Sequence, residues 1–223
     1  MSALVKQNYK NRNISLDLVK VFAAFAVVCI HYMFYGEVGV IVKAISRFAV
    51  PFFFAVSGFF AYRDEHQKMT KKAVHIAKIY FYCFLLYFVY GAVRDMLSGK
   101  VSGFIGYIGT YFQKETIFNF LLNNTTISAG HLWFLPALVY CYIIFYFLKK
   151  FKLSDKVLLV VSVCLLAVRL LVGEVVGFFG VEIDTVFFPR FLFVGVPFFS
   201  FGMFIKNHQS RLNKISTATL ILT

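Results

Sequence analysis

Long, unbroken apolar stretches constrain the fold of this chain more than any other feature of its sequence. The first, at about residues 14–35, is long enough to cross a bilayer, which takes about 20 apolar residues in a helix. Such stretches do not alternate in polarity over about ten residues, as the strands of a transmembrane β-barrel would. We therefore predict an all-α, polytopic transmembrane helix bundle. Its six full spans are expected at about residues 14–35, 47–62, 76–97, 131–148, 156–172 and 187–205.

Composition and charge support a multi-pass protein of the cell membrane. Hydrophobic residues make up 60% of the chain, well above the share in soluble domains. The formal net charge is +13, yet most Lys and Arg fall in alternate loops on one side of the predicted spans. This positive-inside distribution places residues 1–13 in the cytoplasm and indicates the lipid bilayer, not nucleic acid, as the partner. No cysteine or histidine spacing indicates a metal site.

The connections around the second span carry their own signals. Residues 36–46 are expected to form a short outer loop. Pro51 and Gly58 predict a kink or a break within the second span itself. A basic cytoplasmic loop is expected to follow this span, from Arg63 to Lys78.

The longest non-spanning part covers about residues 98–130. Apolar runs at about residues 104–112 and 117–122 are too short to cross, so outer-face interfacial helices or re-entrant pieces are expected there. A seventh apolar segment starts near Ser216, and the sequence ends at Thr223. The sequence therefore predicts one transmembrane domain over residues 14–223. This domain is expected to be incomplete at its C-terminus.

The first span carries a stripe of ionisable residues. Lys20 and His31 are eleven residues apart, and eleven steps of about 100° nearly close three turns, so both share one helix face about 16 Å apart. Asp17 falls within about 60° of Lys20 on the same stripe. Ionisable groups at membrane depth cost about 2.5–3.5 kcal/mol at a helix centre and usually face a bundle interior or a wet cavity. The stripe therefore predicts a membrane-embedded polar site.

Four motifs occur in order along the chain. They are Lys20-x10-His31, with Lys20 closing the sequence LDLVK, then PFFFAVSGF from Pro51, HLWFLP from His131, and Arg190 followed by PFFSFGM from Pro197. Together they resemble the acyltransferase 3 family of integral membrane proteins, over nearly the whole chain. The phrases RFAVPFFF and HLWFLPAL are most similar to one branch, the membrane domain of vancomycin-resistance serine/alanine racemases and its stand-alone relatives.

The resemblance implies a chemistry for the stripe. The family transfers an acyl group, commonly acetyl, from cytoplasmic acyl-CoA to a hydroxyl of a cell-surface glycan or another envelope molecule. His31 is then expected to be the general base, because a neutral imidazole can take a hydroxyl proton near neutral pH. Lys20 is expected to steer the CoA pyrophosphate or the thioester carbonyl, with Asp17 in support. Structural alternatives stay open for both residues. His31 could instead be hydrogen-bonded between helices or lie at the outer interface. Lys20 could instead snorkel to the inner headgroups or form an ion pair with Asp17.

Further candidates bind the two substrates. Candidates for the acceptor lie on the second span and toward the predicted outer side, and they are Ser57, Arg94, His131, Trp133 and Arg190. Packing beside Gly58 is the competing role for Ser57, and interfacial anchoring is the competing role for the others. Candidates for the acyl-CoA phosphates are Lys71, Lys72 and Lys78. The family often carries Arg-x-x-Arg here, whereas this chain has Lys72-x-x-His75 and His75-x-x-Lys78, which suit bidentate phosphate capture less well.

Two other functions remain compatible with the sequence. In the racemase branch the membrane domain precedes a cytoplasmic enzyme, so the polar stripe would suit uptake of a small amino acid such as L-serine. An incomplete chain would also suit an inactive fragment. In the acyltransferase interpretation, acyl-CoA (acetyl-CoA) is the donor substrate, and no bound cofactor is expected.

Overall fold

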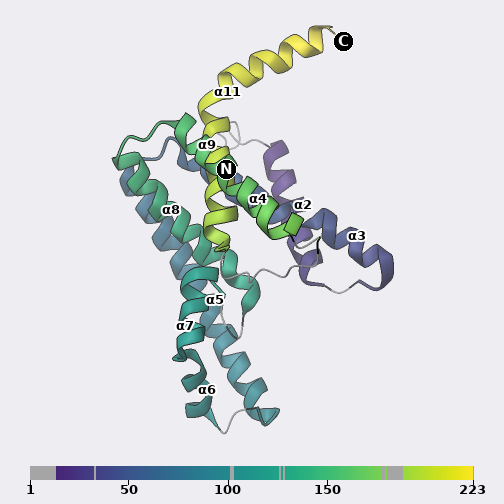
Figure 1. The fold of residues 1–223 in the computed structure, drawn as a ribbon, viewed down its shortest axis with the longest axis vertical. Coiled ribbons are helices and arrows are strands. Elements are labelled where there is room, and N and C mark those ends of the chain that lie inside the picture. Colours follow the sequence, from purple (N-terminus) through teal and green to yellow (C-terminus); the bar gives the residue numbers. More distant parts are fainter. Residues whose placement is uncertain are drawn as a thin grey trace, which may run out of the picture. The chain divides into compact units, whose positions relative to one another are not determined.

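A computed structural model describes residues 14–32, 34–100, 103–125, 127, 129–176, 179 and 188–222. Every regular element in these ranges is a helix (Figure 1). Six segments are long and apolar enough to cross a membrane, and they are Ile14–His31, Gly36–Ala61, His66–Leu97, Gly130–Lys150, Asp155–Gly173 and Phe191–Leu212. This confirms the predicted helical fold and a multi-pass membrane protein. The chain divides into two compact units, Met1–Phe53 and Phe54–Thr223.

The first unit contains α2 (Ile14–His31), which packs against α3 (Gly36–Ser46). Its core is made of small buried side chains with larger apolar ones around them, namely Ala23, Ala26 and Ala49 with Val27, Phe52 and Phe53. The outer loop predicted at residues 36–46 is wrong, because the apolar residues between Glu37 and Lys43 form a helix of their own.

The second span also differs from the prediction. α4 (Ala49–Ala61) runs through Pro51 and Gly58 as one continuous helix, so the predicted kink is wrong. Pro51 lies in the first turn, where a missing N–H removes no helical hydrogen bond. The chain breaks earlier, at a turn of Arg47 and Phe48 between α3 and α4.

The second unit is built around α5 (His66–Leu97) and α8 (Phe134–Lys150), which lie side by side (Figure 1). α5 begins well before the third span predicted at residues 76–97. The segment predicted as a basic cytoplasmic loop is therefore largely the first part of this helix, and Lys71 and Lys78 lie on it. Polar residues outnumber the buried apolar positions Met69 and Ala73 in this first part of the helix, so hydropathy alone does not reveal it.

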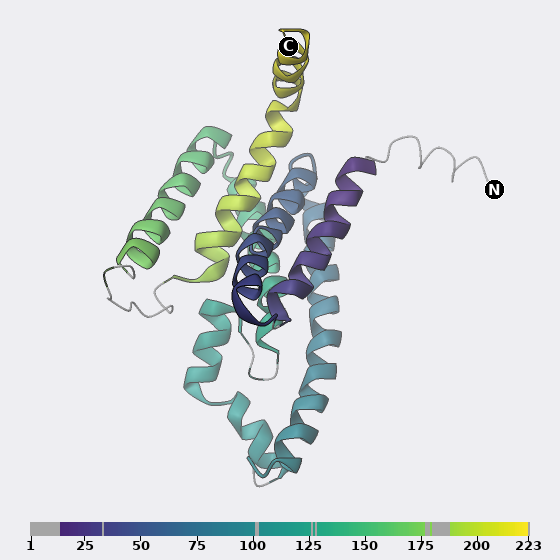
Figure 2. The same cartoon turned by 90° about the vertical axis from the view of Figure 1, so that its right-hand side faces the viewer.

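Two short helices follow α5, as the sequence predicts. α6 (Phe104–Tyr111) and α7 (Lys114–Asn123) match the expected apolar runs between residues 98 and 130. Their rings pack on α5, where the ring of Phe88 lies 5.2 Å from the rings of both Tyr107 and Tyr111. Figure 2 shows both helices folded beside α5.

The rest of the second unit mixes α-helical and π-helical segments. The short 3₁₀ helix η1 (Gly130–Trp133) comes directly before α8. After α8 the chain forms α9 (Asp155–Val168), which continues into the π-helical η2 (Arg169–Val175). The π-helical η4 (Phe191–Gly195) then leads into α11 (Val196–Leu222). α11 packs on α9. Because α11 is continuous to its end, the residues from Ser216 extend the sixth span, and the predicted seventh helix is wrong.

Glycines let α4 and α11 touch through their backbones. A Cβ on Gly58 would overlap the carbonyl of Phe199, and a Cβ on Gly202 would overlap the carbonyl of Ala55. Small residues at such crossings allow the close approach on which helix packing in membranes depends. The packing role weighed for the Ser-Gly motif of the second span is therefore present at its glycine.

Candidate functional site

The polar stripe of α2 contains an ion pair. The Nζ atom of Lys20 lies 3.3 Å from Oδ1 of Asp17, one turn earlier on the helix. The two side chains are 32% and 28% exposed. The pairing foreseen as one alternative for Lys20 is thus present, and it supplies the lysine with a counter-ion of its own chain.

His31 is the last residue of α2, and its side chain is exposed. A rise of 1.5 Å per residue places it about 16 Å from Lys20 along the helix axis. Two groups that far apart cannot act on the same bond. The stripe therefore suits a long substrate, with a charged part at Lys20 and a reacting group at His31.

The second unit brings together two of the predicted acceptor-binding residues. The guanidinium carbon of Arg190 lies 5.2 Å from the ring centre of Trp133. Trp133 is flanked in turn by the ring of Phe54, with 6.3 Å between ring centres. His131, on the same short helix η1, makes an edge contact of 4.7 Å with Tyr87 of α5.

Arg190 is a half-buried cation with a second positive charge nearby. Burial lowers the pKa of its guanidinium, and the nearby positive charge of Arg169 lowers it further. An arginine starts from so high a pKa that it stays charged all the same. A guanidinium is attracted to the face of an indole by its charge, and this contact occupies none of its N–H donors.

The other two acceptor candidates have partners inside the chain. The Ser57 side chain lies near the phenol of Tyr142 on α8. Nε of Arg94 donates to Oδ1 of Asp95 over 2.7 Å. No contact of either residue with Trp133 or Arg190 is recorded among the described residues, so their acceptor-binding role stays a prediction.

The three lysines predicted for the acyl-CoA phosphates separate into two kinds. Lys72 is paired with Asp64, its Nζ 2.5 Å from Oδ2. Lys71 and Lys78 are exposed, and seven residues on a helix bring them to one face. An anion therefore has direct access to Lys71 and Lys78, while Lys72 would have to leave its carboxylate.

Lys149 has a role that the sequence does not reveal. From the end of α8, its Nζ donates to the carbonyls of Ala61, Tyr62 and Asp64 at 2.9, 2.6 and 3.1 Å. These carbonyls end α4 and lead into α5, so one ammonium group satisfies the acceptors that a helix end leaves open. Burial raises the pKa of Tyr62 in the same turn, and the Asp155 carboxylate adds to the rise. Sequence patterns cannot predict such a contact, because backbone carbonyls carry no residue identity.

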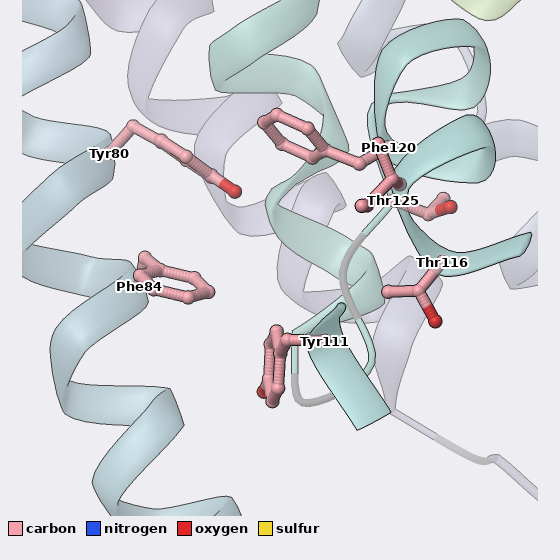
Figure 3. A pocket seen from close by; sticks show the side chains of 7 residues that line it. Tyr80, Phe84, Tyr111, Thr116, Phe120 and Thr125 are labelled. Carbon is pink, nitrogen blue, oxygen red and sulfur yellow. The ribbon is translucent and has the colours of Figure 1, made fainter. Parts of the chain in front are cut away.

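A cavity of about 290 Å³ lies beside α5 at the α6–α7 hairpin (Figure 3). Its lining is mostly aromatic and consists of Tyr80, Phe84, Tyr111, Thr116, Ile117, Phe120 and Thr125. The hydroxyl of Thr116 is bonded to the carbonyl of Thr110 at 2.9 Å. Figure 3 shows the Tyr80 and Phe120 side chains extending toward one another across the space. The lining contains none of the predicted site residues, and its apolar character favours a hydrocarbon group over a sugar.

Comparison with known proteins supports the family resemblance. A model of the acyltransferase 3 family, described as an acyltransferase domain, matches residues 13–223. An amino-acid racemase from Enterococcus faecalis is 29% identical over 174 residues, which are 72% of this chain and 23% of that protein. The chain thus spans about a quarter of that relative's length. No solved structure matches significantly. The chain belongs to the acyltransferase 3 family of integral membrane proteins.

Proposed function

We propose that this protein transfers an acyl group, most simply acetyl, from cytoplasmic acyl-CoA to a hydroxyl of a cell-surface glycan or another envelope molecule. Family membership supports acyl transfer as the reaction class. The observation that carries the proposal further is the stripe of α2, with its Asp17–Lys20 pair and His31 on one helix face. The 16 Å between Lys20 and His31 suits acyl-CoA, whose charged nucleotide and reactive thioester are separated by a long pantetheine arm.

His31 is the proposed general base. Its imidazole takes the proton of the acceptor hydroxyl while the oxygen attacks the thioester carbonyl. The carbon–sulfur bond then breaks, the CoA thiolate leaves, and it recovers a proton to become free CoA. The acceptor carries the new ester.

Lys20 is the proposed donor-binding cation on the cytoplasmic side. Its ammonium would attract the CoA pyrophosphate, and Asp17 holds it in place until the donor arrives. Lys71 and Lys78, exposed on one face of α5, are proposed to contact the remaining CoA phosphates. These cations act by charge, since an ammonium lacks the bidentate geometry of a guanidinium.

A membrane assay with radiolabelled acetyl-CoA tests the proposal. Membranes with the native protein should transfer label to envelope material, and His31→Ala should abolish transfer at equal protein level. His208→Ala is the matched control, because His208 stacks on Phe204 at 4.1 Å within α11 and has no proposed role. Loss of activity in both variants, or retention in His31→Ala, would refute the assignment of His31.

Amino-acid uptake is the second candidate, and the racemase relative is the observation that favours it. In this function the charged stripe of α2 would bind the carboxylate and ammonium groups of a substrate such as L-serine. Saturable uptake of labelled L-serine into vesicles, with no label transfer from acetyl-CoA, would replace acyl transfer by transport.

A further inference from the structure

We propose that Arg190, Arg169 and Trp133 form a binding site for an anionic group, a carboxylate or a phosphate, on the predicted outer side of the second unit. The proposal that this site binds an anion is argued from the contacts of Arg190 and does not depend on the reaction. The proposal that the anion is part of the acceptor rests on the proposed function. The site would restrict the acceptors to anionic envelope molecules.

The position of Arg190 is fixed by aromatic contacts. Its guanidinium lies over Trp133 at 5.2 Å, Phe54 flanks that indole, and the residue after it, Phe191, makes an edge contact of 5.0 Å with Tyr140. A cation–π contact engages the positive charge of the guanidinium and supplies no hydrogen-bond acceptor to its five N–H donors. A cation held by rings is therefore oriented but not neutralised.

Among the side chains that the structure describes, which do not include that of Glu174, no acid is paired with Arg190. The ion pairs recorded there join Lys20 with Asp17, Lys72 with Asp64, and Arg94 with Asp95, and no hydrogen bond to Arg190 is recorded among the described residues. The side chain is half-buried. A half-buried cation without a counter-ion is costly, and an anion in the plane of its donors would offset that cost.

Arg169 supplies a second positive charge to the same place. It begins the π-helical η2, while Arg190 immediately precedes the π-helical η4, and α9 packs on η4. Arg169 is close enough to Arg190 to lower its pKa. An anion bound at Arg190 would also be attracted by the charge of Arg169, and π-helical segments occur frequently at functional sites.

The single tryptophan of the chain makes the site directly measurable. Purified protein at constant ionic strength would be titrated with methyl phosphate, acetate or neutral methyl glucoside while Trp133 fluorescence is recorded. We expect a saturable change with at least one anion and none with the glucoside. The ratio of the two anion affinities distinguishes a phosphate ligand from a carboxylate ligand.

Variants assign the signal to the arginines. Arg190→Gln should weaken anion binding at least about tenfold, equivalent to about 1.4 kcal/mol, and Arg169→Gln should weaken it less. Arg190→Lys should keep part of it. Lys206→Gln is the matched control, because Lys206 also lies over a ring, Phe59 at 4.6 Å, and its removal should change nothing. An unchanged thermal transition would show that Arg190→Gln is folded.

Several results would overturn the proposal. One is the absence of a saturable signal in the native protein, and another is equal binding by native protein and Arg190→Gln. A signal that appears only in the triple variant Glu174→Gln, Glu182→Gln, Asp184→Asn would show that acids of the chain occupy the arginines. The side chains of these three acids lie outside what the structure describes. Anion binding without acyl transfer would refute the proposed function alone, whereas transfer to neutral acceptors without anion binding would refute this site alone.

Discussion

Replacing Lys149 of α8 by Met removes the ammonium group that donates to the carbonyls at the end of α4. The methionine side chain has a similar length. The three carbonyls of Ala61, Tyr62 and Asp64 would lose their shared donor. Hydrogen bonds to charged groups contribute about 1.5–3 kcal/mol each when measured singly. The three hydrogen bonds share one ammonium group, so their contributions do not simply add. Because the site is half-buried, water would also reach some of the carbonyls in the variant. We therefore expect a net loss of about 2–3 kcal/mol in the free energy of unfolding.

The assay is thermal unfolding in detergent, followed by Trp133 fluorescence. For a chain of this size, about 1 kcal/mol corresponds to about 2–4 °C, so Lys149→Met should lower the transition by about 5–10 °C. The neighbouring Lys150→Met is the control, because Lys150 is exposed and its removal takes away one positive charge as well. Equal transitions for the two variants would refute the capping role and reduce Lys149 to another positive-inside residue.

Two further predictions concern packing. Gly202→Ala should prevent the α4–α11 contact and destabilise the protein by more than about 3 kcal/mol, because the new methyl meets backbone of α4, whereas Gly109→Ala has open space and should be neutral or mildly stabilising. Folded yield and unfolding temperature measure both, and a native-like Gly202→Ala would contradict the crossing. Phe120→Ala should enlarge the cavity beside α5 and cost about 1–3 kcal/mol, since Phe120 is only half-buried, while Phe118→Ala, at a side chain 52% exposed, should cost less. The same unfolding assay compares them, and equal costs would show that the cavity lining contributes nothing to stability.

Hydropathy predicts the spans well for a physical reason. A bilayer core leaves no alternative partner for backbone groups, so each long apolar run must be helical. The wrong predictions concern segments to which this requirement of the bilayer core does not apply. Residues 36–46 carry Glu37 and Lys43 and so were expected to be a loop, and the first turns of α5 from His66 are mostly polar. In water or at an interface, neither length nor hydropathy decides between a helix and a loop.

The site was predictable residue by residue but not as an arrangement. Motifs nominate Trp133 and Arg190 separately, and only the packing of η4 against α8 brings these distant positions into contact. The Asp17–Lys20 pair is different, because both residues lie on one helix and the spacing of three already allows it. Local geometry can be worked out from spacing, whereas contacts between helices depend on the whole fold.

The partner that each cation already has within the chain determines how easily the cation can bind an anionic ligand. Lys20 must leave Asp17 to bind a phosphate, but a pair about one-third exposed is worth only about 1 kcal/mol or less, so the exchange costs less than a factor of ten in affinity. A donor that binds and leaves in each cycle requires such a weak pair. Arg190 is balanced by a ring alone among the described residues and gives up no ion pair when an anion arrives. In the function proposed above, Lys20 would therefore serve exchange of the donor, and Arg190 selection of the acceptor.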